Sequence, residues 1–261
     1  MSTPPRVLAT LSAYASEGGF DGRYQPATCF TPSISLGRHP GSGVGDGLWD
    51  EYEAVLNLAA AEGLAGVCLE ISWARLEPRR GQRDEVALAR YARAIAHAQG
   101  LGLHVGLAAI DGAWPAWLGL EAWLLPWVVA VAVEHVVWIA SSLPGDSVSV
   151  FAAREHLTRG FLDAGAGPPW RRGAKEDAQS AERNLDEIEA RSREASPVAL
   201  VTSAAIELDE LDDAVSGVDE VHVRSLLRGS GPLRSEHGLL ARRGDRWVLV
   251  GDVPQGLLRR A

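Results

Sequence analysis

Residues 65–78 read Ala-Gly-Val-Cys-Leu-Glu-Ile-Ser-Trp-Ala-Arg-Leu-Glu-Pro, an apolar run that passes into a polar segment closed by proline. The apolar part, 65–71, has the length and composition of a strand that is buried on both faces. Apolar residues at helical spacing precede it over 49–62, where Gly63 ends the pattern, and follow it over 85–99. This alternation predicts parallel strands that are joined by crossover helices.

The same alternation continues along the chain. Further strands are expected over 7–14, 103–110, 147–151, 198–202 and 220–227, and further helices over 123–140 and 174–195. A hairpin of 238–241 with 247–250 is expected across Arg243-Gly244-Asp245. A complete barrel has eight strands, and this pattern supplies only about six. We therefore predict one domain over residues 1–261, a TIM-barrel-like (β/α) barrel that is reduced to about six strands.

The composition excludes several classes of partner. Acidic residues outnumber basic ones by 34 to 25, and the formal charge of −9 repels nucleic acid. The unbroken apolar stretch 124–133 is too short to span a bilayer, so no membrane partner is expected. Two cysteines, Cys29 and Cys68, are too few for a disulfide framework or a zinc site. Residues 1–6 lack the features of a signal peptide, and we expect a cytoplasmic protein without metal or cofactor.

The segment 70–78, Glu-Ile-Ser-Trp-Ala-Arg-Leu-Glu-Pro, resembles the Ser-Ile-Ser-Trp-Ser-Arg-Ile-x-Pro motif of family 1 glycoside hydrolases. Shorter matches follow in the family's order: residues 9–18 for its first strand, 115–118 for the Pro-x-Trp-Leu after its third, Gly160-Phe161 after its fourth, and 224–227 for its eighth. The resemblance covers nearly the whole chain. It implies a β-glucosidase-like barrel in which the helix 174–195 replaces strands five and six.

The same resemblance implies that the family's catalytic residues are lost. A retaining glycosidase uses two carboxyl groups, one as nucleophile and one as acid/base. The acid/base position at the end of the fourth strand holds Ala152, although another alignment places Glu155 there, on a helical turn past the strand. The nucleophile position on the seventh strand holds Ser203, or Thr202 if the register slips. Hydrolysis by the family mechanism is therefore not expected.

Other polar residues stand where an active site would lie. Alternate strand residues share a face, so Cys68 and Glu70 are expected to point into the barrel together, as are His222 and Arg224. Glu70 and Asp111 end adjacent strands at the carboxyl face, where barrel active sites are built. Two close carboxylates raise one pKa and provide a proton donor and an acceptor. His222 would then serve as a proton relay and Arg224 as an anion clamp.

These residues lead to three hypotheses. In the first, a repurposed barrel performs acid/base chemistry, such as cyclisation, dehydration or isomerisation, on a small organic molecule. Glu70, Asp111, His222 and Arg224 would be catalytic, and the substrate would contact Cys68, Trp114, Trp117, Ser203 and Glu155. The second is a non-catalytic binder or assembly subunit, a homo-oligomer or a complex with a partner protein formed through the helix 123–140. The third is a residual β-glycosidase that cleaves a glycoside with Glu155.

Each candidate residue also has a purely structural interpretation. Glu70 and Arg224 would form an ion pair in a collapsed barrel, His222 would be a satisfied core histidine, and the two tryptophans would be packing residues. Because the burial of several charges without a role is costly, the sequence favours a working pocket.

Overall fold

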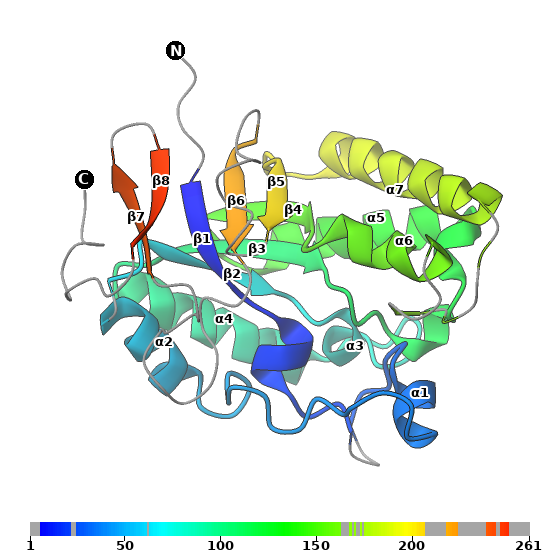
Figure 1. Cartoon of the computed structure of the whole chain (residues 1–261), viewed down its shortest axis with the longest axis horizontal. Helices are drawn as coiled ribbons and strands as arrows, with labels where there is room; N and C mark the ends of the chain where they lie inside the picture. The colour runs from blue at the N-terminus through cyan, green and yellow to red at the C-terminus, as the bar shows by residue number, and fades with distance from the viewer. Residues whose placement is uncertain are drawn as a thin grey trace.

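Within the described residues, six parallel strands form a nearly closed barrel in the computed structural model of the chain, as Figure 1 shows. The structure describes residues 6–21, 25–61, 63–162, 167–168, 170, 173, 175–206, 218–223, 239–243 and 246–250. The barrel strands, in chain order, are β1 (Arg6–Leu11), β2 (Gly66–Glu70), β3 (His104–Ile110), β4 (Ser147–Phe151), β5 (Ser203–Ile206) and β6 (Glu220–Val223).

The strands follow the order β4-β3-β2-β1-β6-β5, and each neighbouring pair runs parallel. The two outer strands meet where the amide of Val201, just before β5, donates to the carbonyl oxygen of Val148 on β4 at 2.9 Å. This contact brings the two edges of the sheet together. The prediction of a TIM-barrel-like fold with about six strands is confirmed.

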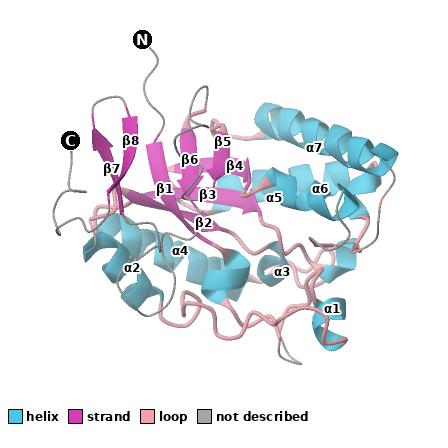
Figure 2. Cartoon of the chain, viewed as in Figure 1, coloured by secondary structure: helices cyan, strands magenta, loops and turns pink. Residues whose placement is uncertain are grey.

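Helices cover the outside of the barrel (Figure 2). Their bounds are α1 (Thr31–Ser35), α2 (Tyr52–Ala61), α3 (Trp73–Leu76), α4 (Glu85–Gly100), α5 (Trp127–Ser142), α6 (Arg154–Leu162) and α7 (Lys175–Ala195), with short helical turns at Ala13–Glu17, Ala116–Leu118 and Ala122–Leu124. Helix α2 packs against α4, and α7 packs against both α5 and α6. In Figure 1 these helices form two separate groups around the strands.

Helix α4 shows how the sequence sets the bounds of an element. Asp84 caps its first turn by accepting hydrogen bonds from the amides of Val86 and Ala87, both at 2.9 Å. Residues at three- and four-residue spacing, among them Tyr91 and Ile95, are buried. The helix expected over 85–99 is therefore confirmed.

The apolar helix α5 is largely enclosed by the chain itself. It lies between β3 and α7, and Val128, Val136 and Ile139 are fully buried there. On its outer side Trp127 is 38% exposed, and the guanidinium of Arg80 lies 5.3 Å from the centre of that ring. In the part of the chain that the structure describes, no helix is both long and apolar enough to cross a membrane.

Helix α7 lies in the chain between β4 and β5, where the resemblance places a helix in place of two strands. Its buried residues recur at helical spacing and are Ala178, Ala181, Leu185, Ile188 and Ser192. Through this face the helix packs on α5 and α6, while Arg191 and Arg193 form ion pairs with Glu187 and Glu189 one turn earlier.

Several element boundaries differ from those expected, and three of the differences have a clear local cause. β1 ends at Leu11 instead of residue 14, because Ser12 caps the helical turn Ala13–Glu17. β5 covers 203–206 instead of 198–202, because the amide and hydroxyl of Thr202 both donate to Asp219 at 2.8 Å before pairing with β6 begins. The helix expected over 123–140 is α5, which begins only after Pro126.

The last strands are only partly described. β6 covers the first part of the strand expected over 220–227, and Arg224 lies outside the described residues. The expected hairpin is confirmed as β7 (Leu239–Arg243) and β8 (Arg246–Val250), which pair antiparallel with Arg243 opposite Arg246.

The barrel interior is narrow and is filled by small side chains around Leu8. Leu8 forms one buried cluster with Cys68, Ala108 and Ala152. A Cβ atom added at Gly66 or Gly106 would lie 2.8 or 2.7 Å from the Leu8 side chain. Eight strands already leave an interior just wide enough for side chains, and six leave less, so both positions require glycine.

Candidate functional site

Three acidic side chains gather at the carboxyl ends of the strands, the end where barrel active sites lie. Glu70 is the last residue of β2, Asp111 directly follows β3, and Glu17 ends the helical turn after β1. All three are buried, and the charges of Glu70 and Glu17 act on Asp111. The structure thus places the predicted pair Glu70 and Asp111 at adjacent strand ends and adds Glu17 to them.

Asp111 is buried and makes no hydrogen bond through its carboxyl group within the described residues. Its side chain is 1% exposed. The amides of Asp111 and Ala113 lie nearby without hydrogen-bond geometry, and their effect, which lowers the pKa of Asp111, is smaller than that of burial. Burial, followed by the charges of Glu70 and Glu17, raises the pKa of Asp111 well above the usual range. Burial therefore favours the protonated form of Asp111.

Glu17 is held by a buried cation and a hydroxyl group. Nε of Arg75 donates to its Oε2 at 2.7 Å, and the hydroxyl of Tyr91 donates to its Oε1 at 2.5 Å. The Arg75 guanidinium also lies 4.4 and 4.0 Å from the ring centres of Phe20 and Trp49. Burial outweighs these favourable contacts and raises the pKa of Glu17 to about 7.

The long loop after β1 packs against the segment that follows β3, where the amide of Cys29 donates to the carbonyl oxygen of Trp114 at 2.9 Å. At Gly18, with φ of 66°, an added Cβ would lie 2.3 Å from the amide nitrogen of Gly45, so only glycine allows the two segments to cross. Further along, the thiol of Cys29 donates to the carbonyl oxygen of Gly112 at 3.6 Å. The loop therefore packs beside Asp111 and contributes to its burial.

Because folding raises the pKa of Asp111, stability should depend on this residue in a pH-dependent way. A carboxyl group with a raised folded pKa contributes stability that is complete below its unfolded pKa, near 3.8, and is lost as the pH rises. Asp111→Asn should therefore be more stable than wild type at pH 7 in urea denaturation. The difference in stability should disappear below about pH 4, where the carboxyl group is protonated in both the folded and the unfolded chain. Above that pH it should grow by at most about 1.4 kcal/mol per pH unit, because a single proton is involved.

The exposed Glu134→Gln is a suitable control for this comparison, because its side chain is 73% exposed and should give no such pH-dependent gap. An Asp111→Asn chain whose stability tracks that of wild type from pH 4 to pH 7 would show that the buried carboxyl ionises normally.

A second feature is a pocket of about 230 Å³ between β4 and β5, beyond the point where the two strands meet. Ala152, which follows β4, Glu155, in the first turn of α6, and Ser203, the first residue of β5, all line it. Arg154 lines it too and binds α7 through Glu182 Oε2 at 2.8 Å. The pocket therefore lies between the position that the resemblance aligns with the family's acid/base, Ala152 or Glu155, and the position that it aligns with the nucleophile, Ser203.

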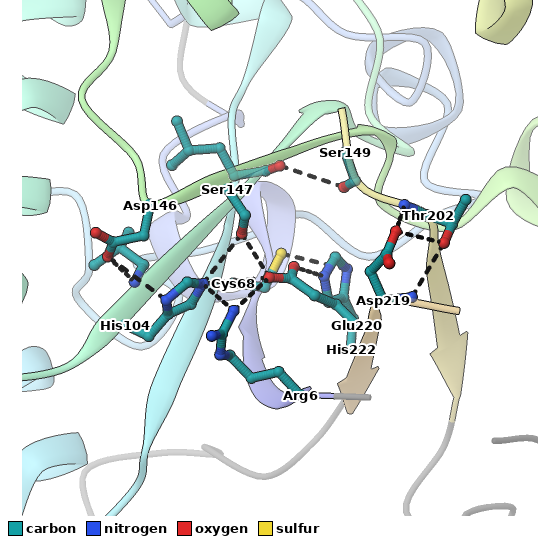
Figure 3. Close-up of polar contacts among 12 residues, drawn as sticks. Arg6, Cys68, His104, Asp146, Ser147, Ser149, Thr202, Asp219, Glu220 and His222 are labelled. Atoms are coloured by element: carbon teal, nitrogen blue, oxygen red, sulfur yellow. Dashed lines mark hydrogen bonds and ion pairs between the residues drawn. The ribbon is translucent and has the colours of Figure 1, made fainter. Parts of the chain in front are cut away.

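At the amino ends of the strands, a polar network crosses the barrel interior (Figure 3). Glu220 accepts hydrogen bonds from Ser147 Oγ at 2.6 Å, His222 Nε2 at 3.1 Å and His104 Nε2 at 3.2 Å, and Arg6 Nη1 lies 3.5 Å away. Burial raises the pKa of Glu220, but these hydrogen bonds outweigh burial and hold it well below the usual range. Because β3 and β4 are not neighbours of β6, Glu220 links strands across the barrel.

Two of the predicted polar residues lie in the barrel interior, below the carboxyl ends. Cys68 is fully buried, and its sulfur lies 3.5 Å from Nδ1 of His222. His222 thus belongs to the network of Glu220. Arg224, predicted to share its face, lies outside the described residues.

The two predicted tryptophans contact other parts of the chain. Trp114 is fully buried, donates from Nε1 to the carbonyl oxygen of Gly119 at 3.0 Å and packs edge-on against Trp123. Trp117 is half-buried and donates from Nε1 to the carbonyl oxygen of Glu77 at 2.7 Å.

Sequence reasoning missed several residues of these clusters. Glu17 and Arg75 both lie within the matched segments, and their occurrence in two separate matches was a signal that they interact. Nothing in the sequence marks Ser147 or His104 as contacts of Glu220. Within the described ranges, no group of three or more His, Cys, Asp or Glu residues has the geometry of a metal site.

Comparisons with known proteins concern the fold. No protein-family model matches the sequence, and no curated protein matches it. Solved β-glycosidase structures do share its fold. The β-glycosidase from Pyrococcus horikoshii superposes with a TM-score of 0.65 and 20% identity over 78% of this chain and 48% of its own. The family 1 β-glucosidase from Thermotoga maritima gives 0.66 and 16% over 79% and 49%.

An aphid myrosinase is similar at a TM-score of 0.66 and 12% identity, over 80% of this chain and 49% of its own. The chain therefore spans about half the length of these structures. Identity this low establishes the fold alone. The resemblance to family 1 glycoside hydrolases is confirmed at that level, as a likeness to a shortened form of their barrel.

Proposed function

We propose that this chain is a non-hydrolytic acid/base enzyme that acts on a small organic molecule at the carboxyl end of its barrel. The observation that carries the proposal is the carboxyl group of Asp111, buried beside Glu70 and without a hydrogen-bond partner in the described part of the chain. Such a group costs roughly 1–3 kcal/mol of stability. Proteins keep such buried polar groups without partners mainly at sites that bind a ligand or catalyse a reaction.

In the proposed chemistry the two carboxyl groups act in opposite ionisation states. Asp111, protonated at neutral pH, donates its proton to a carbonyl or hydroxyl oxygen of the substrate. Glu70, acting as the base, removes a proton from a neighbouring atom, so that the two transfers balance without an external acid. Isomerisation, dehydration and cyclisation all require this pair of transfers. The loop beside Asp111 shields this site from water, which strengthens the electrostatic interactions of both carboxyl groups with a substrate.

The pocket between β4 and β5 supports the absence of family-type hydrolysis. Double displacement at a sugar requires two carboxyl groups about 5 to 5.5 Å apart, and the aligned positions hold Ala152 and Ser203. Glu155 lines the same pocket, so a residual β-glycosidase that uses it is the alternative.

The test begins with the proton itself. Infrared difference spectra between wild type and Asp111→Asn at pH 7 should contain the carbonyl stretch of a protonated carboxylic acid, because burial keeps the acid neutral. A difference spectrum that contains only carboxylate bands would remove Asp111 as the donor.

Turnover is then sought with panels of small carbonyl and hydroxy compounds and of aryl β-glycosides. For the substrate found, Glu70→Gln and Asp111→Asn should each lower kcat by about 10²–10⁴-fold. Glu155→Gln, in the separate pocket, should leave kcat nearly unchanged. Release of nitrophenol from a β-glycoside, abolished by Glu155→Gln, would instead establish the residual glycosidase.

A further inference from the structure

The loop after β1, described over residues 12–21 and 25–48, is attached to the barrel beside the proposed site. The thiol of Cys29 in this loop donates to the carbonyl oxygen of Gly112 at 3.6 Å. Gly112 directly follows Asp111 in the chain. The position of the loop therefore decides how well Asp111 is shielded from water.

Nearer to β1, the loop is held by a buried carboxyl group. Glu17 accepts hydrogen bonds from Nε of Arg75 at 2.7 Å and from the hydroxyl of Tyr91 at 2.5 Å. The Arg75 guanidinium also donates to the carbonyl oxygen of Gly18, and the Tyr91 hydroxyl accepts from the amide of Ser72 at 3.0 Å. These bonds tie the start of the loop to α4 and to the segment that follows β2.

Two segments of the loop are joined on either side of Glu17. The amide of Asp46 donates to the carbonyl oxygen of Ser16 at 3.0 Å. The amide of Gly19 donates to the carbonyl oxygen of Gly43 at 2.7 Å. Because Glu17 lies between Ser16 and Gly19 in the chain, its contacts also hold the returning segment of the loop in place.

The position of Glu17 makes its negative charge costly. In the pair that it forms with Arg75, the two side chains are 1% and 4% exposed. Removing two charges from water can cost more than their attraction returns. A protonated carboxyl group avoids this cost and still accepts hydrogen bonds, so the contacts of Arg75 and Tyr91 survive protonation. Burial accordingly raises the pKa of Glu17 to about 7 despite these two partners.

The surroundings of Glu17 contain more acidic than basic partners close to its carboxyl group. The titratable and charged side chains that face it are Arg75 of α3, Tyr91 and Arg90 of α4, Tyr52 of α2, Glu70 of β2 and Asp111 after β3. Within the described residues, Arg75 is the one cation that bonds to Glu17. The charge of Glu70 acts in the opposite direction and raises the pKa of Glu17.

A small void gives this carboxyl group access to protons while the loop stays in place. The void has a volume of about 20 Å³, enough for one water molecule, and Glu17 lines it. Its other lining residues include Trp49, Tyr52 and Arg90, which are half-buried and reach the surface. A proton can therefore pass between solvent and Glu17 by exchange of a single water molecule.

We propose that Glu17 is a pH-sensitive latch, which holds the loop after β1 in place while it is protonated and weakens that hold when it ionises. This inference rests on the proposed function, because the loop shields the site that contains Asp111. Opening of the loop brings Glu17 into water, where the carboxyl group loses one proton to the solvent. The site is therefore more accessible at neutral pH than in mild acid.

The pH range of the latch follows from the two states of the loop. Below the ordinary pKa of 4.5, Glu17 is protonated whether the loop is closed or open, and the latch is at full strength. Between this value and about 7 only the closed loop keeps the proton, so opening becomes easier by up to roughly tenfold per pH unit. Above about 7 the carboxyl group is ionised in both states, and opening no longer changes with pH.

Hydrogen exchange of backbone amides measures this opening in the full chain without a substrate. The amides of Gly19 and Asp46 report on the loop beside the latch, and the amide of Cys29, which donates to Trp114 at 2.9 Å, reports on its attachment near the proposed site. Exchange rates corrected for the intrinsic pH dependence of amide exchange give the opening equilibrium. From pH 5 to pH 7, opening at all three amides should increase roughly 10²-fold.

Substitutions assign this increase to Glu17. Glu17→Gln stays neutral and keeps acceptor capacity, so opening should no longer depend on pH. Glu134→Gln, whose side chain is 73% exposed, should behave as wild type, and Asp111→Asn should retain the increase. If Glu17→Gln does not fold, as judged by near-ultraviolet circular dichroism, Tyr91→Phe takes its place. It removes a hydrogen bond that lowers the pKa of Glu17, so the increase should continue above pH 7.

Opening that does not change with pH in wild type would overturn the latch, as would an unchanged increase in Glu17→Gln. An increase at Gly19 and Asp46 that is absent at Cys29 would also overturn it, because the latch would then not control the shielding of Asp111. None of these results bears on the protonated carboxyl band of Asp111, so the latch and the proposed function can fail separately.

Discussion

Glu220→Ala is expected to lower the free energy of unfolding by about 3–5 kcal/mol, the cost of breaking a buried charge network by removing one partner. Glu220 accepts hydrogen bonds from β3, β4 and β6 in the barrel interior, so its loss leaves His104, Ser147 and His222 without their common acceptor. Urea denaturation followed by tryptophan fluorescence measures the change.

The pH dependence of this effect has a defined sign. The pKa of Glu220 is lowered by folding, so its contribution is complete above its unfolded pKa of 4.5 and is lost as the pH falls. The difference between wild type and Glu220→Ala should therefore shrink in acid. Glu182→Ala, which removes an exposed ion pair of 2.8 Å to Arg154, should cost no more than about 1 kcal/mol. A loss at Glu220 as small as that at Glu182 would mean that the network does not hold the barrel closed.

Arg75→Ala should also lower the free energy of unfolding by about 3–5 kcal/mol, because it leaves Glu17 buried without its cation. The substitution also removes the packing of the guanidinium between Phe20 and Trp49 and its hydrogen bond to the carbonyl oxygen of Gly18. The pKa of Glu17, already about 7, should rise further and can be followed by the pH dependence of unfolding.

Arg83→Ala is a matched control on the surface. Arg83 pairs with Glu134 at 2.9 Å and lies 4.4 Å from the ring centre of Trp138, so it makes the same two kinds of contact in an exposed position. Its loss should cost no more than about 1 kcal/mol. If both arginine variants lose equal stability, burial does not strengthen the Arg75 cluster.

The elements that were predicted correctly have local causes. Strand 65–71 and helix 85–99 follow from hydrophobic periodicity and from capping residues such as Asp84, all within a few positions of each other. The start of β5 was wrong because it depends on Thr202 bonding to Asp219, 17 residues away. The number of strands, about six, followed from the alternation along the whole chain and is confirmed.

The polar clusters show what local patterns cannot supply. Glu220 and His104 are 116 residues apart and meet only because a six-stranded barrel brings β6 opposite β3. Asp111 was singled out from its place after a strand, but its lack of a partner depends on the packing around it. His222 was expected beside the carboxyl end, whereas its bond to Glu220 belongs to the opposite end.

The two glycines around Leu8 have a further consequence. Since Gly66 and Gly106 let that side chain occlude the axis, neither a metabolite nor a hydrated ion can pass lengthwise through the molecule. Any ligand must therefore enter and leave the barrel at one of its two rims.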